Sequence, residues 1–307
     1  MAHNLPRPVL PNVVPTSDAA CTVTHVSLSN ESSPKFTPGT RVSPIQDIAS
    51  LTTDPPSQTR CWLAADTDGV LATHVVFPEH VLVKIPTHLS DAEASILPCA
   101  GVTAWTTLQG LKKGDVVLIQ GTGGVSLVAV KFVVAMGGKV ILSTASAEKA
   151  RRVEKLFSGT EGSIIGSVNY ASNLDWHEEV LNLTGGVGVD LVLENGGTSS
   201  LVKSFKCTKR GGIVSQVGYL GKQDPAELKE MLPLLIDRKI LLRGINVGSR
   251  QDFEEMNQFI DQHGLHFVEL IDRTFSFEDA ERAIEYLGEV GPFGKIIIEV
   301  KKSESLT

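Results

Sequence analysis

The sequence predicts an α/β protein built on a doubly wound parallel sheet. Two observations carry this prediction: apolar, strand-like runs alternate with helix-like segments from residue 112 onward, and a glycine-rich turn follows the first of these runs. A third observation concerns the beginning of the chain, where nine prolines fall within the first 60 residues. Proline removes a backbone donor, so only short strands fit there, and regular structure is expected later.

Before residue 112 we expect three short strands and one helix. The strands are placed at 21–26, 69–77 and 80–85, where apolar and β-branched residues gather between turn signals. The helix is placed at 91–109, because Ser90 is a good N-cap for the periodic segment that follows it.

After residue 112 the alternation is regular. Six strands are expected, at 115–120, 139–143, 167–170, 190–194, 212–217 and 240–247. Helices are expected between and after them, at 123–136, 147–157, 174–183, 198–208, 227–237 and 251–262. Strands that are apolar on both faces indicate a parallel sheet covered on both sides.

A helix at 275–288 and a strand at 295–300 close the chain. We therefore expect a nucleotide-binding domain over residues 112–264, and a second domain made of residues 1–111 and 265–307.

The strongest motif is the turn that follows the strand at 115–120. Gly121 permits a tight turn, and Gly123 lets the backbone approach a pyrophosphate closely. The helix that follows offers free N–H groups and the positive end of its dipole to the phosphates. Ser126 replaces the third glycine of the usual G-x-G-x-x-G pattern, and it is small enough for close packing of helix and strand. This context predicts a Rossmann-type dinucleotide site.

The residues after the second strand of this domain bear on the choice of cofactor. An NAD enzyme has an acidic side chain there for the ribose 2′-hydroxyl. This chain has Ser143, Thr144 and Ser146 instead, followed by Lys149, which is positioned to pair with a 2′-phosphate. The alternative is that Lys149, Arg151 and Arg152 form a solvated helix face. A missing acid together with a nearby cation favours NADP(H).

Composition excludes several other classes of protein. The net charge of −7 argues against nucleic acid or an anionic membrane as the main partner. No apolar run approaches the ~20 residues of a membrane span, and the first residues lack the apolar core of a signal peptide, so a cytoplasmic protein is expected. The four cysteines are far apart and form no C-x-x-C pair, which favours buried thiols over a zinc ribbon or disulfides.

Together these motifs resemble a known family. The segments 97–105, 120–126, 183–190, 246–250 and 291–300 are similar to zinc-type alcohol dehydrogenase-like proteins, which belong to the medium-chain dehydrogenase/reductase superfamily and lie near the quinone oxidoreductases. The resemblance implies a Rossmann domain joined to a GroES-like β-barrel domain. It also implies a homodimer paired through the edge strand at 240–247.

The resemblance further implies which residues meet the cofactor. The implied contacts are Gly121, Gly123, Gly124, Val125, Ser146, Lys149, Tyr170, Val217, Gly218, Tyr219, Val247 and Ser249. Gly123, Gly124 and Val125 would lie at the phosphates, Ser146 and Lys149 at the 2′-phosphate, Tyr170 near the adenosine ribose or phosphate, and the last five at the nicotinamide end. Trp62, Trp105 and Phe293 are expected to line an apolar substrate cleft, although aromatic residues at these places are equally typical of a core.

The chain also departs from the family pattern. The given chain lacks the segment that forms the first strands of the barrel in the family, so a shortened GroES-like domain is expected; the alternative is a gene start placed too far downstream. Ser17 and Asp18 stand where the zinc enzymes have a His-Glu pair, and Cys99 lies near the place of a later metal ligand. One possible ligand without its partners does not hold zinc, so no metal is expected.

Two functional hypotheses follow. The first is a zinc-independent, NADPH-dependent reductase of an enone, quinone or other carbonyl, with a bulky and hydrophobic substrate. The second is a repurposed non-redox enzyme (a cyclase, isomerase or lyase) or a nucleotide-binding accessory protein on the same fold. The sequence alone identifies no catalytic residue.

Overall fold

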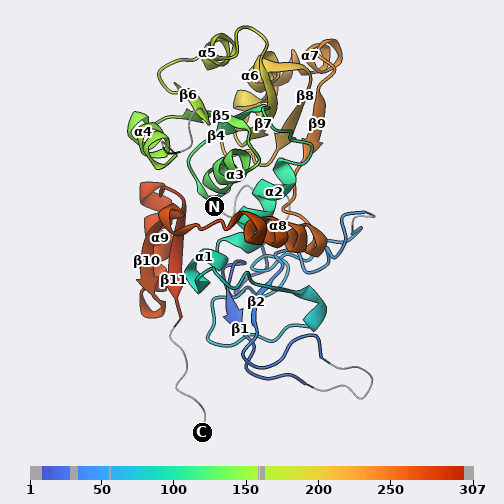
Figure 1. Ribbon diagram of the computed structural model, residues 1–307, viewed down its shortest axis with the longest axis vertical. Coiled ribbons are helices and arrows are strands. Elements are labelled where there is room, and N and C mark those ends of the chain that lie inside the picture. Colours follow the sequence, from blue (N-terminus) through green and yellow to red (C-terminus); the bar gives the residue numbers. More distant parts are fainter. Residues whose placement is uncertain (1–8, 28–33, 55–56, 158, 160–162, 301–307) are drawn as a thin grey trace. The chain divides into compact units, whose positions relative to one another are not determined.

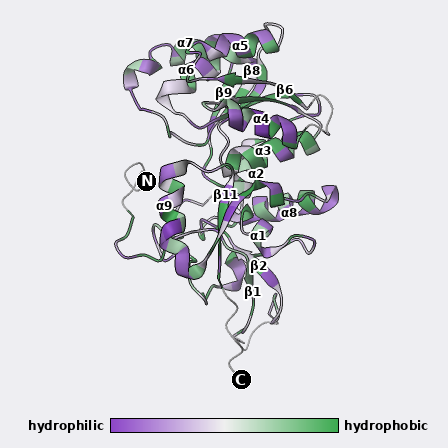
Figure 2. Ribbon diagram, turned by 90° about the vertical axis from the view of Figure 1, so that its left-hand side faces the viewer, coloured by the Kyte–Doolittle hydropathy of each residue, from purple (hydrophilic) through white to green (hydrophobic). Residues whose placement is uncertain are grey.

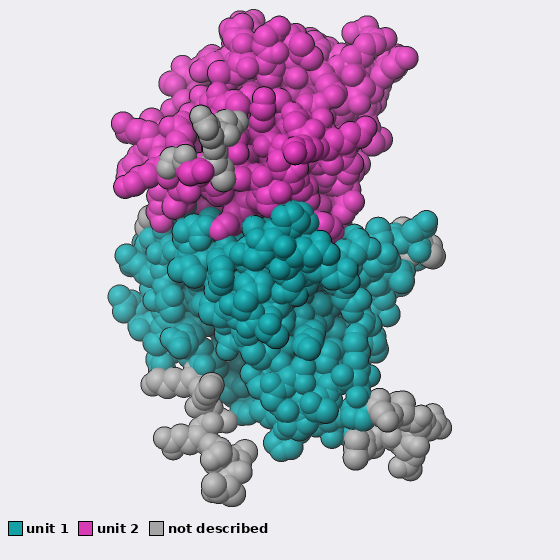
Figure 3. All heavy atoms as spheres, viewed as in Figure 1, with its two compact units in different colours: residues 1–102, 247–307 teal, residues 103–246 magenta. Residues whose placement is uncertain are grey.

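The computed structural model describes residues 9–27, 34–54, 57–157, 159 and 163–300. The chain forms two compact units (Figure 3). Unit 1 consists of residues 1–102 and 247–307, and unit 2 consists of residues 103–246. These bounds differ from the predicted domain limits at 112 and 264, because residues 103–111 group with unit 2 and residues 247–264 group with unit 1.

Unit 2 contains a six-stranded parallel sheet. Its strands are β4 (Val116–Gln120), β5 (Lys139–Thr144), β6 (Ile164–Asn169), β7 (Val189–Glu194), β8 (Thr208–Gln216) and β9 (Leu241–Gly244). Their spatial order is β6-β5-β4-β7-β8-β9, and each strand pairs in parallel with its neighbours. The predicted α/β class and doubly wound sheet are therefore confirmed.

Helices cover both faces of this sheet (Figure 1). They are α2 (Val102–Thr107), α3 (Gly124–Ala135), α4 (Ala147–Leu156), α5 (Trp176–Leu183), α6 (Thr198–Cys207) and α7 (Met231–Asp237). On one face, Trp176 and Phe205 pack with sheet residues such as Leu118 in a continuous buried cluster. The helix α3 is apolar along most of its length (Figure 2) and contacts β4 and β5.

The β-structure of unit 1 is sparse in the part of the chain described. An antiparallel sheet joins β1 (Cys21–Thr22), β2 (Arg41–Pro44) and β3 (Leu82–Lys84), and a parallel pair joins β10 (Ile271–Ser276) to β11 (Lys295–Glu299). The strand predicted at 69–77 is wrong. That segment begins with Gly69 and Val70 bonded to the backbone of residues 14–16 and then leaves Val76 exposed, so it forms no ladder.

The helix predicted at 91–109 is broken into three pieces. After α1 (Asp91–Ala94) the chain makes a π-turn over Leu97–Gly101, and α2 then begins. Pro98 lies at the start of this turn, and proline cannot donate the hydrogen bond that a continuous α-helix needs there.

Two further helices belong to unit 1. The helix α8 (Arg250–His263) is capped by Ser249, and its Asn257 donates to the carbonyl of Lys84 on β3 (2.9 Å), which explains its place in unit 1. The helix α9 (Ala280–Val290) begins five residues later than predicted, because Phe275 lies on β10, where it pairs with Ile298.

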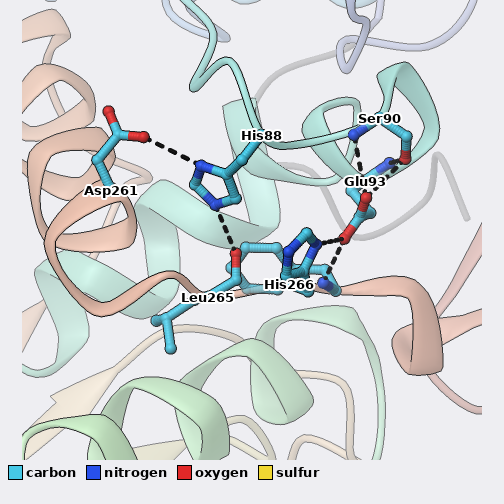
Figure 4. A network of polar contacts seen from close by, with 7 residues as sticks. His88, Ser90, Glu93, Asp261, Leu265 and His266 are labelled. Atoms are coloured by element: carbon cyan, nitrogen blue, oxygen red, sulfur yellow. Dashed lines mark hydrogen bonds and ion pairs between the residues drawn. The ribbon is translucent and has the colours of Figure 1, made fainter.

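A polar network fixes the N-terminus of α1 in unit 1 (Figure 4). The carboxylate of Glu93 accepts hydrogen bonds from the backbone N–H groups of Ser90 (3.0 Å) and Phe267 (2.8 Å), and it also contacts His266 (3.0 Å). Burial alone would raise the pKa of Glu93, but these bonds together lower it to about 2.

In the described residues, no helix is both long enough and apolar enough to span a bilayer.

Candidate functional site

The topology of unit 2 indicates a ligand site at the carboxyl ends of the central strands of the sheet. The chain runs outward from β4 to β6, and then returns to β7 on the other side of β4. In open parallel sheets, ligands bind at the carboxyl ends of the strands where the order reverses in this way. The carboxyl ends of these two central strands are Gln120 and Glu194.

The glycine-rich turn lies directly at this point. Gly121 has a φ of +83° and donates its N–H to the carbonyl of Ser143 (2.6 Å), a conformation that favours glycine. Gly123 precedes α3 and has no atom within 4 Å of the position where a Cβ would lie. The hydroxyl of Ser126 donates to the carbonyl of Gln120 (2.8 Å), so this serine ties α3 to the end of β4. The N-terminus of α3 is therefore open to an anion.

The carboxyl end of β5 carries hydroxyl groups and no acid. Ser146 caps α4, because its side chain accepts the N–H of Lys149 (3.2 Å). The backbone N–H of Ser146 in turn donates to the hydroxyl of Thr144 (3.2 Å). The hydroxyl of Ser146 thus has a structural role that the sequence analysis did not anticipate.

A hollow of about 400 Å³ lies beside this end of β5. Its wall includes Thr144 and Arg151, together with Glu154 and Glu179. These two carboxylates accept hydrogen bonds from Ser167 (3.1 Å) and Asn173 (3.0 Å). Arg151, which the sequence analysis did not select, therefore faces a cavity at the strand end.

The predicted residues at the end of β8 lie beside the end of β7. The N–H groups of Val217 and Gly218 both donate to the carbonyl of Glu194, at 2.8 and 3.2 Å. Tyr219 follows in an exposed position, and Tyr170 is exposed directly after β6.

Glu194 itself was missed by the sequence analysis. Its side chain is fully buried, and its carboxylate accepts hydrogen bonds from Gln120 Nε2 (2.7 Å) and from the N–H groups of Gly196 (2.8 Å) and Gly197 (3.1 Å). Burial raises the pKa of this carboxyl, and the hydrogen bonds oppose the rise. The signal in the sequence was an acid that directly follows the apolar run Leu191–Leu193, in a strand next to that of the glycine turn.

The remaining predicted residues divide between the units. Val247 has a φ of +56°, a strained conformation for a β-branched residue, and Ser249 is buried with its hydroxyl bonded to Asp252 (2.7 Å). Trp62 and Phe293 belong to unit 1, where Phe293 is buried and the guanidinium of Arg60 lies over the Trp62 ring.

Trp105 belongs to unit 2. Its ring packs edge-on against the ring of Phe132, with the two ring centroids 6.0 Å apart. This contact joins α2 to α3 and gives Trp105 a packing role within its own unit.

An ion pair lies at the positions where zinc enzymes of the family have their His-Glu pair. Asp18 accepts a hydrogen bond from Ser17 (3.2 Å) and binds the Lys295 ammonium group (2.8 Å). Burial alone would lower the pKa of Lys295, but the Asp18 carboxylate and the nearby Cys99 raise it. Within the described ranges, no three His, Cys, Asp or Glu side chains gather as a metal site.

Comparisons with known proteins agree with this geometry. Residues 124–262 match the family model of the zinc-binding dehydrogenases. A zinc-type alcohol dehydrogenase-like protein of Schizosaccharomyces pombe is 33% identical over 244 residues, which cover 78% of this chain and 68% of the relative. A 2-haloacrylate reductase of Burkholderia is 29% identical over 247 residues, which cover 75% of this chain and 70% of the reductase.

The crystal structure of an alcohol dehydrogenase from Sinorhizobium meliloti, assigned only provisionally as such, has the same fold. Its TM-score is 0.83 at 34% identity, and the match covers 95% of this chain and 83% of that one. The chain belongs to the medium-chain dehydrogenase/reductase superfamily of oxidoreductase enzymes, among the zinc-type alcohol dehydrogenase-like proteins.

Proposed function

We propose that this protein is a zinc-independent, NADPH-dependent reductase of an enone, a quinone or another bulky, hydrophobic carbonyl compound. The observation that carries the proposal is the pairing of an open phosphate turn at Gly123 with a β5 end that has hydroxyls where an NAD enzyme has an acid.

The residues of unit 2 offer a binding partner for each part of NADPH. The backbone at Gly123, Gly124 and Val125 would hold the pyrophosphate at the N-terminus of α3. Lys149 and Arg151 are the cations on α4 closest in sequence to the end of β5, and they would hold the 2′-phosphate. When bound, the nicotinamide group supplies a hydride. Val217 and Gly218, held by the carbonyl of Glu194, would border that group.

The direction of the reaction is proposed from a relative. The 2-haloacrylate reductase is named for the reduction of an acrylate, which is a conjugated, electron-poor alkene. Hydride addition to such an alkene is chemically akin to the reduction of an enone, because both place the negative charge next to a carbonyl group.

The donor set at the expected zinc position supports chemistry without a metal. A catalytic zinc needs three protein ligands with nitrogen, sulfur or carboxylate donors. Here the hydroxyl of Ser17 replaces a stronger ligand, and the carboxylate of Asp18 is already paired with Lys295. In this proposal, hydrogen-bond donors of the protein polarise the substrate carbonyl in place of a metal ion.

We also propose a homodimer that forms through β9. This strand lies at the edge of the six-stranded sheet, and large apolar side chains are exposed on it and on α7. Leu241 is 55% exposed, Leu232 61% and Ile236 75%. Pairing two copies of β9 would satisfy the free strand edge and cover these side chains.

The direct test is a panel of enones, quinones and small aldehydes assayed with NADPH and with NADH. We expect loss of reduced-cofactor absorbance that depends on the substrate, is faster with NADPH, and favours bulky substrates. Conversion of a substrate with NADPH left unconsumed would replace this proposal with a non-redox function. Failure of the wild-type protein to bind either cofactor in a calorimetric titration would refute the cofactor assignment.

A further inference from the structure

Glu194 lies where three segments of the candidate site meet. It ends β7, the strand that neighbours β4 at the point of reversal, and its side chain is fully buried. A buried carboxylate is costly unless donors surround it, so the identity of those donors shows what the side chain stabilises.

One carboxylate oxygen holds the loop that follows β7. Glu194 Oε1 accepts the N–H groups of Gly196 (2.8 Å) and Gly197 (3.1 Å), and it also accepts the hydroxyl of Ser200 on α6. The loop therefore turns back over the end of its own strand.

The other carboxylate oxygen reaches the strand of the glycine turn. Glu194 Oε2 accepts Gln120 Nε2 (2.7 Å) and the hydroxyl of Ser204. Gln120 directly precedes Gly121, and its own Oε1 accepts the N–H of Asn195 (2.9 Å). The amide group of Asn195 donates to the carbonyl of Gln120 (3.0 Å), so the two strand ends are cross-linked in both directions.

The backbone of Glu194 holds a third segment. Its carbonyl oxygen accepts the N–H groups of Val217 (2.8 Å) and Gly218 (3.2 Å) after β8. A single residue thus contacts Gln120 at the start of the glycine-rich turn (residues 121–125), the 195–197 loop and the 217–218 segment, all of them within unit 2.

We propose that Glu194 is a positioning residue of the dinucleotide site, which holds these three segments in a fixed arrangement through its carboxylate and its carbonyl oxygen. The inference rests on the proposed function, because it assigns the three segments to one cofactor. Small displacements of donors from their productive positions are expensive in binding and in catalysis, and a rigid support prevents them.

Three of the donors to Glu194 are N–H groups that cannot act as acceptors, and they lie against both carboxyl oxygens, so both oxygens must accept. The donors to Glu194 are N–H and O–H groups, and an ionised carboxylate has acceptor sites only. In Glu194→Gln the amide oxygen would take the place of Oε1, since the N–H groups of Gly196 and Gly197 cannot reverse. The new amide nitrogen would then face the Nε2 group of Gln120, donor against donor.

Glu93→Gln is a matched control. Glu93 is also a buried carboxylate held by backbone N–H groups and a serine hydroxyl, but it lies in unit 1 and belongs to the network of α1. Both substitutions should lower the melting temperature. Only Glu194→Gln should raise the Kd for NADPH, by about tenfold, the equivalent of one lost charge-assisted hydrogen bond. NADH should lose affinity by the same factor, because the affected segments do not read the 2′-phosphate.

Amide hydrogen exchange without cofactor provides a second readout. We expect faster exchange in Glu194→Gln at residues 121–125, 195–197 and 217–218, and no change there in Glu93→Gln. If Glu194→Gln does not fold, Gln120→Leu cuts the same link and should give a smaller change in the same segments. An unchanged Kd at an equal loss of melting temperature, or exchange that rises evenly over unit 2, would overturn the proposal. If the wild-type protein binds neither cofactor, the proposed function fails, while the exchange experiment still decides the role of Glu194.

Discussion

Gly123 stands at the start of α3 with empty space where a side chain would project. Its φ of −81° is open to any residue, so Gly123→Val should fold normally. We expect NADPH binding to be lost, because the valine would occupy the space of the phosphates, while the melting temperature stays within a few degrees of the wild type. Calorimetric titration and thermal unfolding test this, with Gly123→Ala as the milder control. Normal affinity in the valine variant would contradict the phosphate assignment.

Lys149 and Arg151 are the two residues proposed to bind the 2′-phosphate of NADPH, and single substitutions can distinguish them. Lys149 is the sequence-based choice, whereas Arg151 lines the hollow beside β5. Removing the true partner should cost about 1.5–3 kcal/mol of NADPH binding and leave NADH binding unchanged. The Kd values of both cofactors for Lys149→Ala and Arg151→Ala identify it. Equal losses for the two cofactors would mean that the residue only supports the fold.

The candidate site residues that a sequence indicates most directly are those that shape the backbone. Gly121 and Gly123 are recognised because a strand precedes them and a helix follows. Ser146 and Ser249 are harder, since a serine before a helix serves as a cap as readily as a ligand contact, and the structure shows both as caps. Glu194 escapes detection because an acid at the end of a strand says nothing by itself about burial, and its bond to Gln120 joins positions 74 residues apart.

Among the elements, α1 owes its stability to the ionised form of Glu93. The folded pKa of about 2 lies below the ordinary value of 4.5, so this stabilisation is complete above pH 4.5 and is lost as the pH falls toward 2. We expect Glu93→Gln to lower the free energy of unfolding by about 1–3 kcal/mol at pH 7, and to flatten its decline in acid. Urea unfolding of both proteins from pH 7 to pH 3 measures this. If the unfolding free energies of the two proteins fall in parallel between pH 7 and pH 3, the charge of Glu93 does not stabilise α1.

The elements of unit 2 could be predicted because the central strands β4, β5 and β7 are buried and mostly apolar, and each crossover has its own helix. The elements of unit 1 were harder to predict from the sequence. Pro98 interrupts a segment with helical periodicity, and the apolar stretch at 69–77 finds no ladder partner. The strand β10 was overlooked, because its register is set by β11, more than twenty residues away.

For the whole molecule, the exposed side chains at β9 make the oligomeric state testable. Ile236→Asp with Leu241→Lys should leave unit 2 folded, since both side chains already face solvent. We expect a dimer for the wild type and a monomer for this variant, measured by sedimentation equilibrium. A wild-type monomer at high concentration, or a variant that remains dimeric, would place any interface elsewhere.

Metal dependence is a further property of the whole protein. Because the carboxylate of Asp18 is paired with the ammonium group of Lys295, we expect the purified protein to carry no stoichiometric zinc. A chelator should leave both activity and melting temperature unchanged, as measured beside a known zinc dehydrogenase treated in the same way. One zinc per chain by elemental analysis would overturn the zinc-independent assignment.

The helix α3 is enclosed in apolar contacts, with Leu127, Val128, Val130, Phe132 and Val133 fully buried. Tilting or sliding it would open voids in close-packed surroundings, so the end of α3 proposed to face the phosphates is already in place before any ligand arrives. The conformational entropy lost on binding then falls almost entirely on the flexible torsions of the nucleotide itself. In such a protein the phosphate turn acts as a fixed anchor, and discrimination between nucleotides is left to the two ends of the ligand.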